Sequence, residues 1–292
     1  MTELDRRELL LGSAATWLAL SPAAAATPAG PPLWLVRRGS AKLYFFGQLP
    51  VRADSAWQSE QVLRAFDAST EFWTENPDPA SGPPPAPRAP SGPKLVDSIT
   101  QDEMRRLRAA LVREGLKEDA LDATPLSDAY SAVSYLQDHA LGVDYSSIPE
   151  RVLRNKAKQA GKAVHSEWAS FDEIARFRDS MAADTRIALD LELFRRGLIE
   201  AEDVDNARQR LDGWLHGDLR ALNAMERNQG RRYPLISKLV GADRNKAWVT
   251  RTAGIMQRNA TAFACQGIGH LLGSQSIQAF LQRAGYQVSR AA

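Results

Sequence analysis

The amino-acid sequence predicts an α/β protein whose mixed sheet is built from strands near both ends of the chain, with a long helical region between them. Short apolar, β-compatible runs lie at residues 34–38, 42–46 and 261–265. From about residue 98 to residue 260, apolar residues at helical spacing and repeated helix-start signals predict a mainly helical middle. Without an internal repeat, this pattern favours one α/β sheet with a helical insertion or subdomain.

The N-terminal strands are predicted from their composition and from the turn between them. Gly39-Ser40 separates residues 34–38 from residues 42–46, which is typical of a β-hairpin. A helix is expected over residues 56–69, because Val62, Leu63 and Phe66 share one face.

Helix-start signals divide the middle region. Thr124-Pro125 predicts a start with an N-cap side chain and proline at the first helical position. Residues 147–150 and 170–173 each fit the capping-box pattern. The last helix is expected from Ser274 to Ala284, ended by Gly285. Residues at helical spacing predict a core-facing stripe: Val204, Ala207, Leu211, Trp214, Leu215, Leu222 and Met225.

Two segments are expected to lie outside this regular structure. Residues 77–93 hold eight of the 16 prolines and little apolar bulk, which predicts a loop with polyproline character. Arg6-Arg7 precedes an apolar run and the alanines of residues 23–26, so residues 1–26 are predicted to be a twin-arginine signal peptide. The mature chain, residues 27–292, is then expected to be periplasmic or secreted, with no transmembrane segment remaining.

Composition excludes several classes of protein. The net charge of +2 and the lack of blocks of like charge give no support for nucleic-acid binding. Cys265 is the single cysteine, so it forms no internal disulfide, and its apolar surroundings predict a buried thiol. The motifs of zincins, serine hydrolases and phosphate-loop proteins do not occur.

The segment Gly267-Ile268-Gly269-His270 is the most informative candidate for a site. It follows an apolar strand, and its two glycines allow a sharp turn that projects the imidazole from the carboxyl end of that strand. Ligand crevices of open α/β sheets lie at this edge. A lone histidine is also compatible with a structural, hydrogen-bonded role.

Several segments, taken in order, resemble the TraB/GumN family, which includes the Tiki-type proteases. The resemblance covers about residues 31–290, and the order and spacing of its motifs make it fairly specific. It rests on Pro32-Leu33-Trp34-Leu35-Val36, Phe46-Gly47-Gln48-Leu49-Pro50-Val51, the strand before Glu75, Gly142-Val143-Asp144, residues 161–167, Trp214-Leu215-His216-Gly217-Asp218, Arg244-Asn245 with Trp248, Gly267 to His270, and residues 284–288.

The family pattern also implies what should be found at the site. It implies an erythromycin-esterase/ChaN-like α/β fold whose strand ends bring together Glu75, Glu167 and His270. With His270 and Glu75 as ligands, the resemblance implies a divalent metal such as Mn²⁺, Co²⁺ or Zn²⁺. Glu167 could then act as general base, while Arg244 and Asn245 orient a substrate carbonyl.

The chain departs from the family pattern at one position. The family's first Gly-x-x-His motif ends here in Pro50, which offers no donor or acceptor side chain. We therefore expect any metal binding to be weak and to depend on His270. Each candidate also has a structural alternative: Glu75 as a solvated strand end, Glu167 as a helix cap, and Arg244 and Asn245 as capping groups.

Two functions remain open at this stage, and whether the protein is an enzyme is one of the open questions. The first is a metal-dependent, peptidase-like hydrolase with a degraded metal site, acting on a peptide or small molecule. The second is a non-catalytic periplasmic binding or interaction protein on the same fold. Pro50 favours the second, whereas Glu75, Arg244, Asn245 and His270 favour a retained site.

Overall fold

A computed structural model describes residues 30–78 and 92–291 of the chain. The predicted signal peptide and most of the proline-rich segment lie outside the described residues. Those two predictions are therefore not tested by the structure.

Within the described residues, six strands form one mixed sheet in the order β4-β3-β5-β2-β1-β6. The strands are β1 (Leu33–Arg38), β2 (Ala41–Gln48), β3 (Glu71–Thr74), β4 (Ala163–Ser166), β5 (Thr261–Gly267) and β6 (Gln287–Arg290). Strands β4, β3, β5 and β2 run parallel to one another, and β1 runs antiparallel to both β2 and β6. The carboxyl ends of four strands therefore meet at one edge of the sheet.

The predicted mixed sheet and helical middle are confirmed, with one addition. Strand β4 comes from the helical middle and pairs with β3 as an outermost strand of the sheet. Its sequence, Ala-Val-His-Ser, is short and only partly buried, so hydrophobic periodicity gives it little signal. The predicted hairpin at Gly39-Ser40 is confirmed, because β1 and β2 pair antiparallel around it.

The α-helices of the described residues lie between residues 60 and 283, with strands β3, β4 and β5 among them. They are α1 (Glu60–Asp67), α2 (Gln101–Arg113), α3 (Leu126–Leu141), α4 (Pro149–Gln159), α5 (Phe171–Asp179), α6 (Ala183–Glu202), α7 (Val204–Leu215), α8 (Leu219–Arg232), α9 (Asp243–Gln257) and α10 (Ile277–Arg283). A π-helical segment, Ile236–Ala242, connects α8 to α9, and a short 3₁₀ turn, Ile268–Leu271, follows β5.

Several helix starts differ from those predicted. Helices α1 and α10 begin later than expected, because the hydroxyls of Ser59 and Ser276 accept the first free N–H groups. Helix α3 begins after Pro125, with no side-chain cap from Thr124. Gly285 follows α10 with a φ of +84°, as expected for a glycine that ends a helix.

The two predicted capping boxes have different outcomes. At α5 the Ser170 hydroxyl accepts the N–H of Glu173, while the Glu173 carboxylate accepts the N–H of Ala169 rather than that of Ser170. The box predicted at residues 147–150 is wrong. Helix α4 has no side-chain cap, and Glu150 instead points into the interior, where it accepts hydrogen bonds from Gln48 and Arg154.

The predicted stripe over residues 204–225 is only partly buried. It is divided between α7 and α8 by a turn at Gly217, and only Trp214 and Leu222 of the stripe are buried. The Trp214 indole N–H donates to the carbonyl of Gly47 at 2.6 Å and so joins the helical region to the end of β2. Asp218, which ends the family-like segment that begins at Trp214, caps α8 by accepting the N–H of Ala221 at 3.0 Å.

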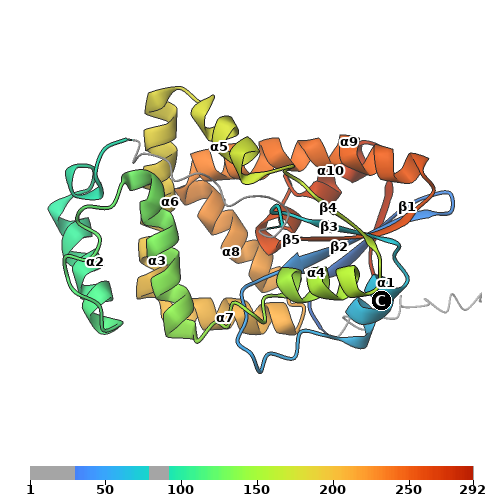
Figure 1. The fold of residues 1–292 in the computed structure, drawn as a ribbon, viewed down its shortest axis with the longest axis horizontal. Coiled ribbons are helices and arrows are strands. Elements are labelled where there is room, and N and C mark those ends of the chain that lie inside the picture. The colour runs from blue at the N-terminus through green and yellow to red at the C-terminus, as the bar shows by residue number, and fades with distance from the viewer. Residues whose placement is uncertain (1–29, 79–91, 292) are drawn as a thin grey trace, which may run out of the picture.

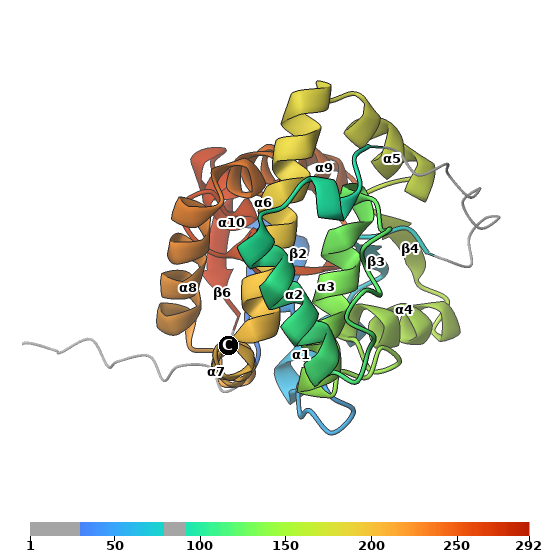
Figure 2. The same cartoon turned by 90° about the vertical axis from the view of Figure 1, so that its left-hand side faces the viewer.

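The sheet lies between two helical layers, with α9 and α10 on one face and α1 and α4 on the other (Figure 1). Helices α2, α3 and α6 form a separate group beyond the carboxyl edge of the sheet, as the turned view shows (Figure 2). The main core surrounds the sheet and includes Phe46, Trp214, Trp248 and Phe263. None of the helices in residues 30–78 and 92–291 is long and apolar enough to cross a membrane.

Candidate functional site at the carboxyl edge of the sheet

The parallel strands place two candidate residues, Glu75 and Glu167, side by side. Thr74 of β3 pairs with Cys265 of β5 on one side and with Ser166 of β4 on the other. Glu75, Glu167 and Gly267 lie next to these positions at the same edge. The convergence that the sequence and the family resemblance predicted is therefore built by strand register.

Arg244 joins the two carboxylates. Its Nη2 donates to Glu75 Oε1 at 3.1 Å and to Glu167 Oε2 at 3.0 Å, and its Nε donates to Glu167 Oε1 at 3.1 Å. This fork across Glu167 uses the planar geometry of guanidinium. The side chains of Arg244, Glu75 and Glu167 are only 14%, 17% and 3% exposed, so one guanidinium is shared by two carboxylates in a largely dry environment.

Glu167 is held by further donors. The Trp248 indole N–H donates to its Oε2 at 3.3 Å, and Arg251 donates to its backbone carbonyl at 2.8 Å. Helix α5 is capped by Ser170, so Glu167 does not serve as the cap of that helix. Its carboxylate is therefore committed to an internal network.

His270 lies on the 3₁₀ turn after β5 and is oriented by Asn245. The Asn245 amide nitrogen donates to the carbonyl of Gln275 at 2.7 Å, which directs its Oδ1 toward His270 Nδ1, also at 2.7 Å. An amide oxygen only accepts, so Nδ1 of His270 has the proton. The other ring nitrogen, Nε2, lies 3.4 Å from Glu75 Oε1.

Glu75 is kept ionised by its neighbours. Burial acts to raise the pKa of Glu75, but His270, Arg244 and the N–H of Gly267 together hold it well below its ordinary value. The Gly267 N–H donates to Glu75 Oε2 at 2.9 Å. Both carboxylate oxygens therefore have protein partners, and the solvated strand end considered from sequence does not describe this residue.

Glu150 is a site residue that the sequence interpretation missed. Its Oε2 accepts the N–H of Glu75 at 3.1 Å, and its Oε1 accepts from Arg154 at 2.5 Å. Burial raises the pKa of Glu150 to about 7; Arg154 opposes this increase and the charge of Glu75 adds to it. The sequence did not reveal this inward-pointing carboxylate, because Pro149-Glu150 also fits the start of a helix.

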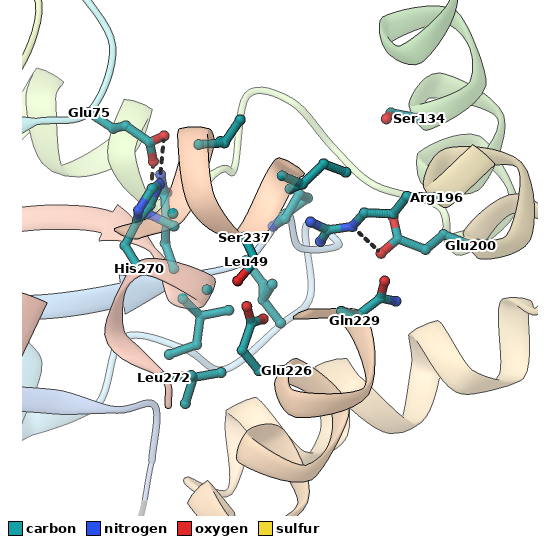
Figure 3. Close-up of a pocket in the computed structure, with 18 of the residues that line it drawn as sticks. Leu49, Glu75, Ser134, Arg196, Glu200, Glu226, Gln229, Ser237, His270 and Leu272 are labelled. Atoms are coloured by element: carbon teal, nitrogen blue, oxygen red, sulfur yellow. Dashed lines mark hydrogen bonds and ion pairs between the residues drawn. The ribbon is translucent and has the colours of Figure 1, made fainter. Parts of the chain in front are cut away.

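A cavity of about 850 Å³ opens beside this cluster. Its wall includes Glu75, Glu150, Asn245, His270 and Pro50. It extends from the strand ends to the helices beyond the sheet edge, with Glu75 and His270 at one end and Arg196 and Glu200 at the other (Figure 3). Gln48 belongs to this wall as well, but its side chain is bonded to Glu150.

The predicted residues are thus brought together in one network. Glu75, Glu167, Arg244, Asn245 and His270 all belong to it. Arg244 and Asn245 lie in the first turn of α9, as expected, but their side chains bond across the site and do not cap the helix.

The side chains at this edge do not form a complete set of metal ligands. Within residues 30–78 and 92–291, no group of three or more His, Cys, Asp or Glu residues is arranged to hold a metal ion. Of the two predicted ligands, Glu75 already accepts from Arg244 and Gly267, and His270 faces Glu75. Pro50 adds no donor atom. Metal binding at His270 and Glu75 therefore remains a prediction.

This architecture defines an α/β protein with a charged site at the carboxyl ends of parallel strands. The model of the TraB/PrgY/gumN family matches residues 32–290, nearly the whole chain, and the protein belongs to that family. Searches of curated proteins and of solved structures gave no match.

Proposed function

We propose that this protein is an exported, non-catalytic binding member of the TraB/PrgY/gumN family, with the cavity at the carboxyl edge of the sheet as its ligand site. The observation that carries the proposal is the complete internal pairing of the strand-end cluster. Arg244 bonds to Glu75 and Glu167, and His270 is held between Asn245 and Glu75.

A catalytic role would require some of these contacts to be broken. A metal at Glu75 would displace Arg244 or the Gly267 N–H from its oxygens, and a base at His270 would need a nitrogen directed at substrate. Both ring nitrogens of His270 instead point at protein groups. The cavity itself has space for a small molecule, since ligand pockets of a few hundred Å³ upward are common.

Thermal unfolding against a small-molecule library tests the binding proposal. Ser237 lines the cavity, so Ser237→Trp should fill it and remove the stabilisation given by any library compound bound there. Ser289→Trp, at an exposed position on β6 outside the cavity wall, is the matched control and should retain binding. Compounds that stabilise wild type and Ser237→Trp equally would place binding elsewhere.

Hydrolysis is the second candidate function, and Glu150 is the observation that favours it. A carboxyl with a pKa raised to about 7 is suited to proton transfer near neutral pH, and Glu150 lines the cavity beside Glu75. Incubation with a mixed peptide library and Mn²⁺, Co²⁺ or Zn²⁺ tests this candidate. Cleavage that His270→Ala abolishes would support the hydrolase and contradict the binding proposal.

Export is supported by the paired arginines and the apolar run of the leader. Replacing both Arg6 and Arg7 with lysine should leave the precursor in the cytoplasm. Unchanged export of that variant would contradict the twin-arginine route.

A further inference from the structure

The far end of the cavity, away from the strand-end cluster, contains charges that lack complete partners. It is walled by α3, α6, α7, α8 and the π-helical segment. Figure 3 shows both ends of the cavity, with the apolar side chains of Leu49 and Leu272 and the carboxylate of Glu226 between them.

Arg196 presents a guanidinium to this space. Its Nε donates to Glu200 at 3.0 Å, and its side chain is 20% exposed. The terminal nitrogens point into the cavity in Figure 3, and the part of the chain that the structure describes gives them no hydrogen bond. Glu200 is also shared with Arg210 at 3.8 Å, so one carboxylate faces two guanidinium groups.

Glu226 presents the opposite charge. It lies on α8, and in Figure 3 its carboxylate reaches the middle of the cavity beside Leu49 and Leu272, on the way from Arg196 to His270. A Cβ atom added at Gly269 would lie 3.5 Å from its Oε2. Among the described residues Glu226 has neither a hydrogen-bond nor an ion-pair partner. It lies close enough to be among the groups that raise the pKa of Arg196 against the effect of burial, yet the two form no ion pair within 4 Å.

Two neutral groups at the same end also lack partners. The hydroxyl of Tyr233 is buried and unbonded in a residue that is only 5% exposed, and the amide oxygen of Gln229 is buried and unbonded too. Both residues line the cavity. Glu226, Gln229 and Tyr233 lie three and four residues apart, so α8 and its C-cap present them on one face. Buried polar groups without partners are uncommon, and in a cavity wall they are available to a ligand.

We propose that the cavity binds a zwitterionic group of the α-amino-acid class between Arg196 and Glu226, with its carboxylate on Arg196 and Tyr233 and its ammonium on Glu226. An anion alone would leave Glu226 unpaired beside it, and a cation alone would face Arg196. A ligand with both charges satisfies both residues, and Leu49 and Leu272 beside Glu226 offer apolar surface to its side chain. The inference rests on the proposed function and names the ligand class for the same cavity.

Calorimetric titration with L-leucine tests the proposal, with isocaproate and isoamylamine as probes that lack the amino or the carboxylate group. Charged hydrogen bonds contribute enough that each analogue should bind at least ~10-fold more weakly than leucine. A free amino acid and a short peptide both have an ammonium and a carboxylate group, and the dipeptide leucyl-leucine distinguishes these two sources. Tighter binding of leucine assigns the site to free amino acids, and tighter binding of the dipeptide assigns it to peptide termini.

Two variants should each remove a different one of these two preferences. Arg196→Gln should remove the preference for leucine over isoamylamine, and Glu226→Gln should remove the preference for leucine over isocaproate. A loss of folding would not produce opposite changes. Ser289→Trp serves as the control that retains both preferences.

Two results would overturn the proposal, and they differ in what they say about the binding function. If library compounds bind in the cavity but wild type does not prefer leucine to its analogues, the zwitterion site is wrong and the binding function stands. If neither leucine nor any library compound binds in a way that Ser237→Trp prevents, both proposals fail.

Discussion

The two ends of the cavity contain similar residue types in opposite states of pairing. At the sheet edge, Glu75, Glu167 and Arg244 satisfy one another, and His270 is oriented by Asn245. Farther along the cavity, Glu226 in its middle and the terminal nitrogens of Arg196 at its far end face the space unbonded among the described residues. A charge that is internally paired contributes to the folded structure, whereas a charge left unpaired in a cavity is available to a ligand. The comparison therefore assigns structure to the sheet edge and recognition to the far end.

Removal of Arg244 should give the largest effect. Arg244→Ala leaves the carboxylates of Glu75 and Glu167 buried without their cation, which should lower the free energy of unfolding by about 3–5 kcal/mol. Urea unfolding measures this change. The exposed pair of Arg208 with Asp205, whose side chains are 63% and 83% exposed, gives the control, and Arg208→Ala should cost less than about 1 kcal/mol. Equal effects of the two variants would contradict a structural role for the sheet-edge network.

The pH dependence of stability should report Glu150. Its pKa rises from 4.5 in the unfolded chain to about 7 in the folded protein. The folded state therefore binds the proton more tightly, and the resulting stability is complete below the unfolded pKa and is lost as the pH rises through 7. At about 1.4 kcal/mol per pKa unit, the loss is roughly 2–3 kcal/mol between pH 4 and pH 8.

The difference between wild type and Glu150→Gln isolates this contribution from that of other groups. The variant should show a flatter dependence across the same pH range in urea unfolding. Glu75 contributes in the opposite sense, because its lowered pKa stabilises the protein above its unfolded pKa and this stability is lost as the pH falls. Parallel pH curves for wild type and Glu150→Gln would show that burial does not raise the pKa of Glu150.

Asn245→Ala should have an intermediate effect. It removes the hydrogen bonds to His270 and to the carbonyl of Gln275, at a cost of about 2 kcal/mol for buried partners. Nitrogen chemical shifts of the His270 ring should show a proton fixed on Nδ1 in wild type and a mixture of tautomers in the variant. An unchanged ring spectrum would mean that Asn245 does not orient His270.

Arg196→Gln should have the smallest effect on folding. The variant loses the Nε bond to Glu200, but Glu200 retains Arg210 nearby and the terminal nitrogens of Arg196 make no bond within the described residues, so the free energy of unfolding should fall by about 1–2 kcal/mol. A loss as large as that of Arg244→Ala would show that Arg196 is structural and would remove the contrast between the two ends.

The sheet-edge site could be predicted in outline because strand ends and the Gly267 to His270 turn have local sequence signals. Register then brought Glu75 and Glu167 together, as the family resemblance implied. Partner choice could not be predicted, since the bond from Arg244 to Glu75 joins residues 169 positions apart. Glu150 was misjudged because a helix start and an inward-pointing carboxylate have the same local pattern.

The far end of the cavity gave no usable signal in the sequence. Arg196 and Glu200 are four residues apart, which is typical of an exposed helical ion pair. Only the packing of α6 against α3 and α7 places them in a cavity wall. Strand β4 was missed for a related reason, because its four residues are too short and too polar to show a period.

Calorimetric titration of the metal-free protein with Mn²⁺, Co²⁺ and Zn²⁺ tests the central claim most directly, since it asks whether the sheet-edge cluster is a metal centre or an internally paired network. The account predicts weak binding to wild type, none that is specific in His270→Ala, and a gain in Pro50→His, where an imidazole is restored to the cavity wall. Tight binding to wild type that His270→Ala leaves unchanged would place the ligands elsewhere. Tight binding that His270→Ala abolishes would contradict the paired network itself.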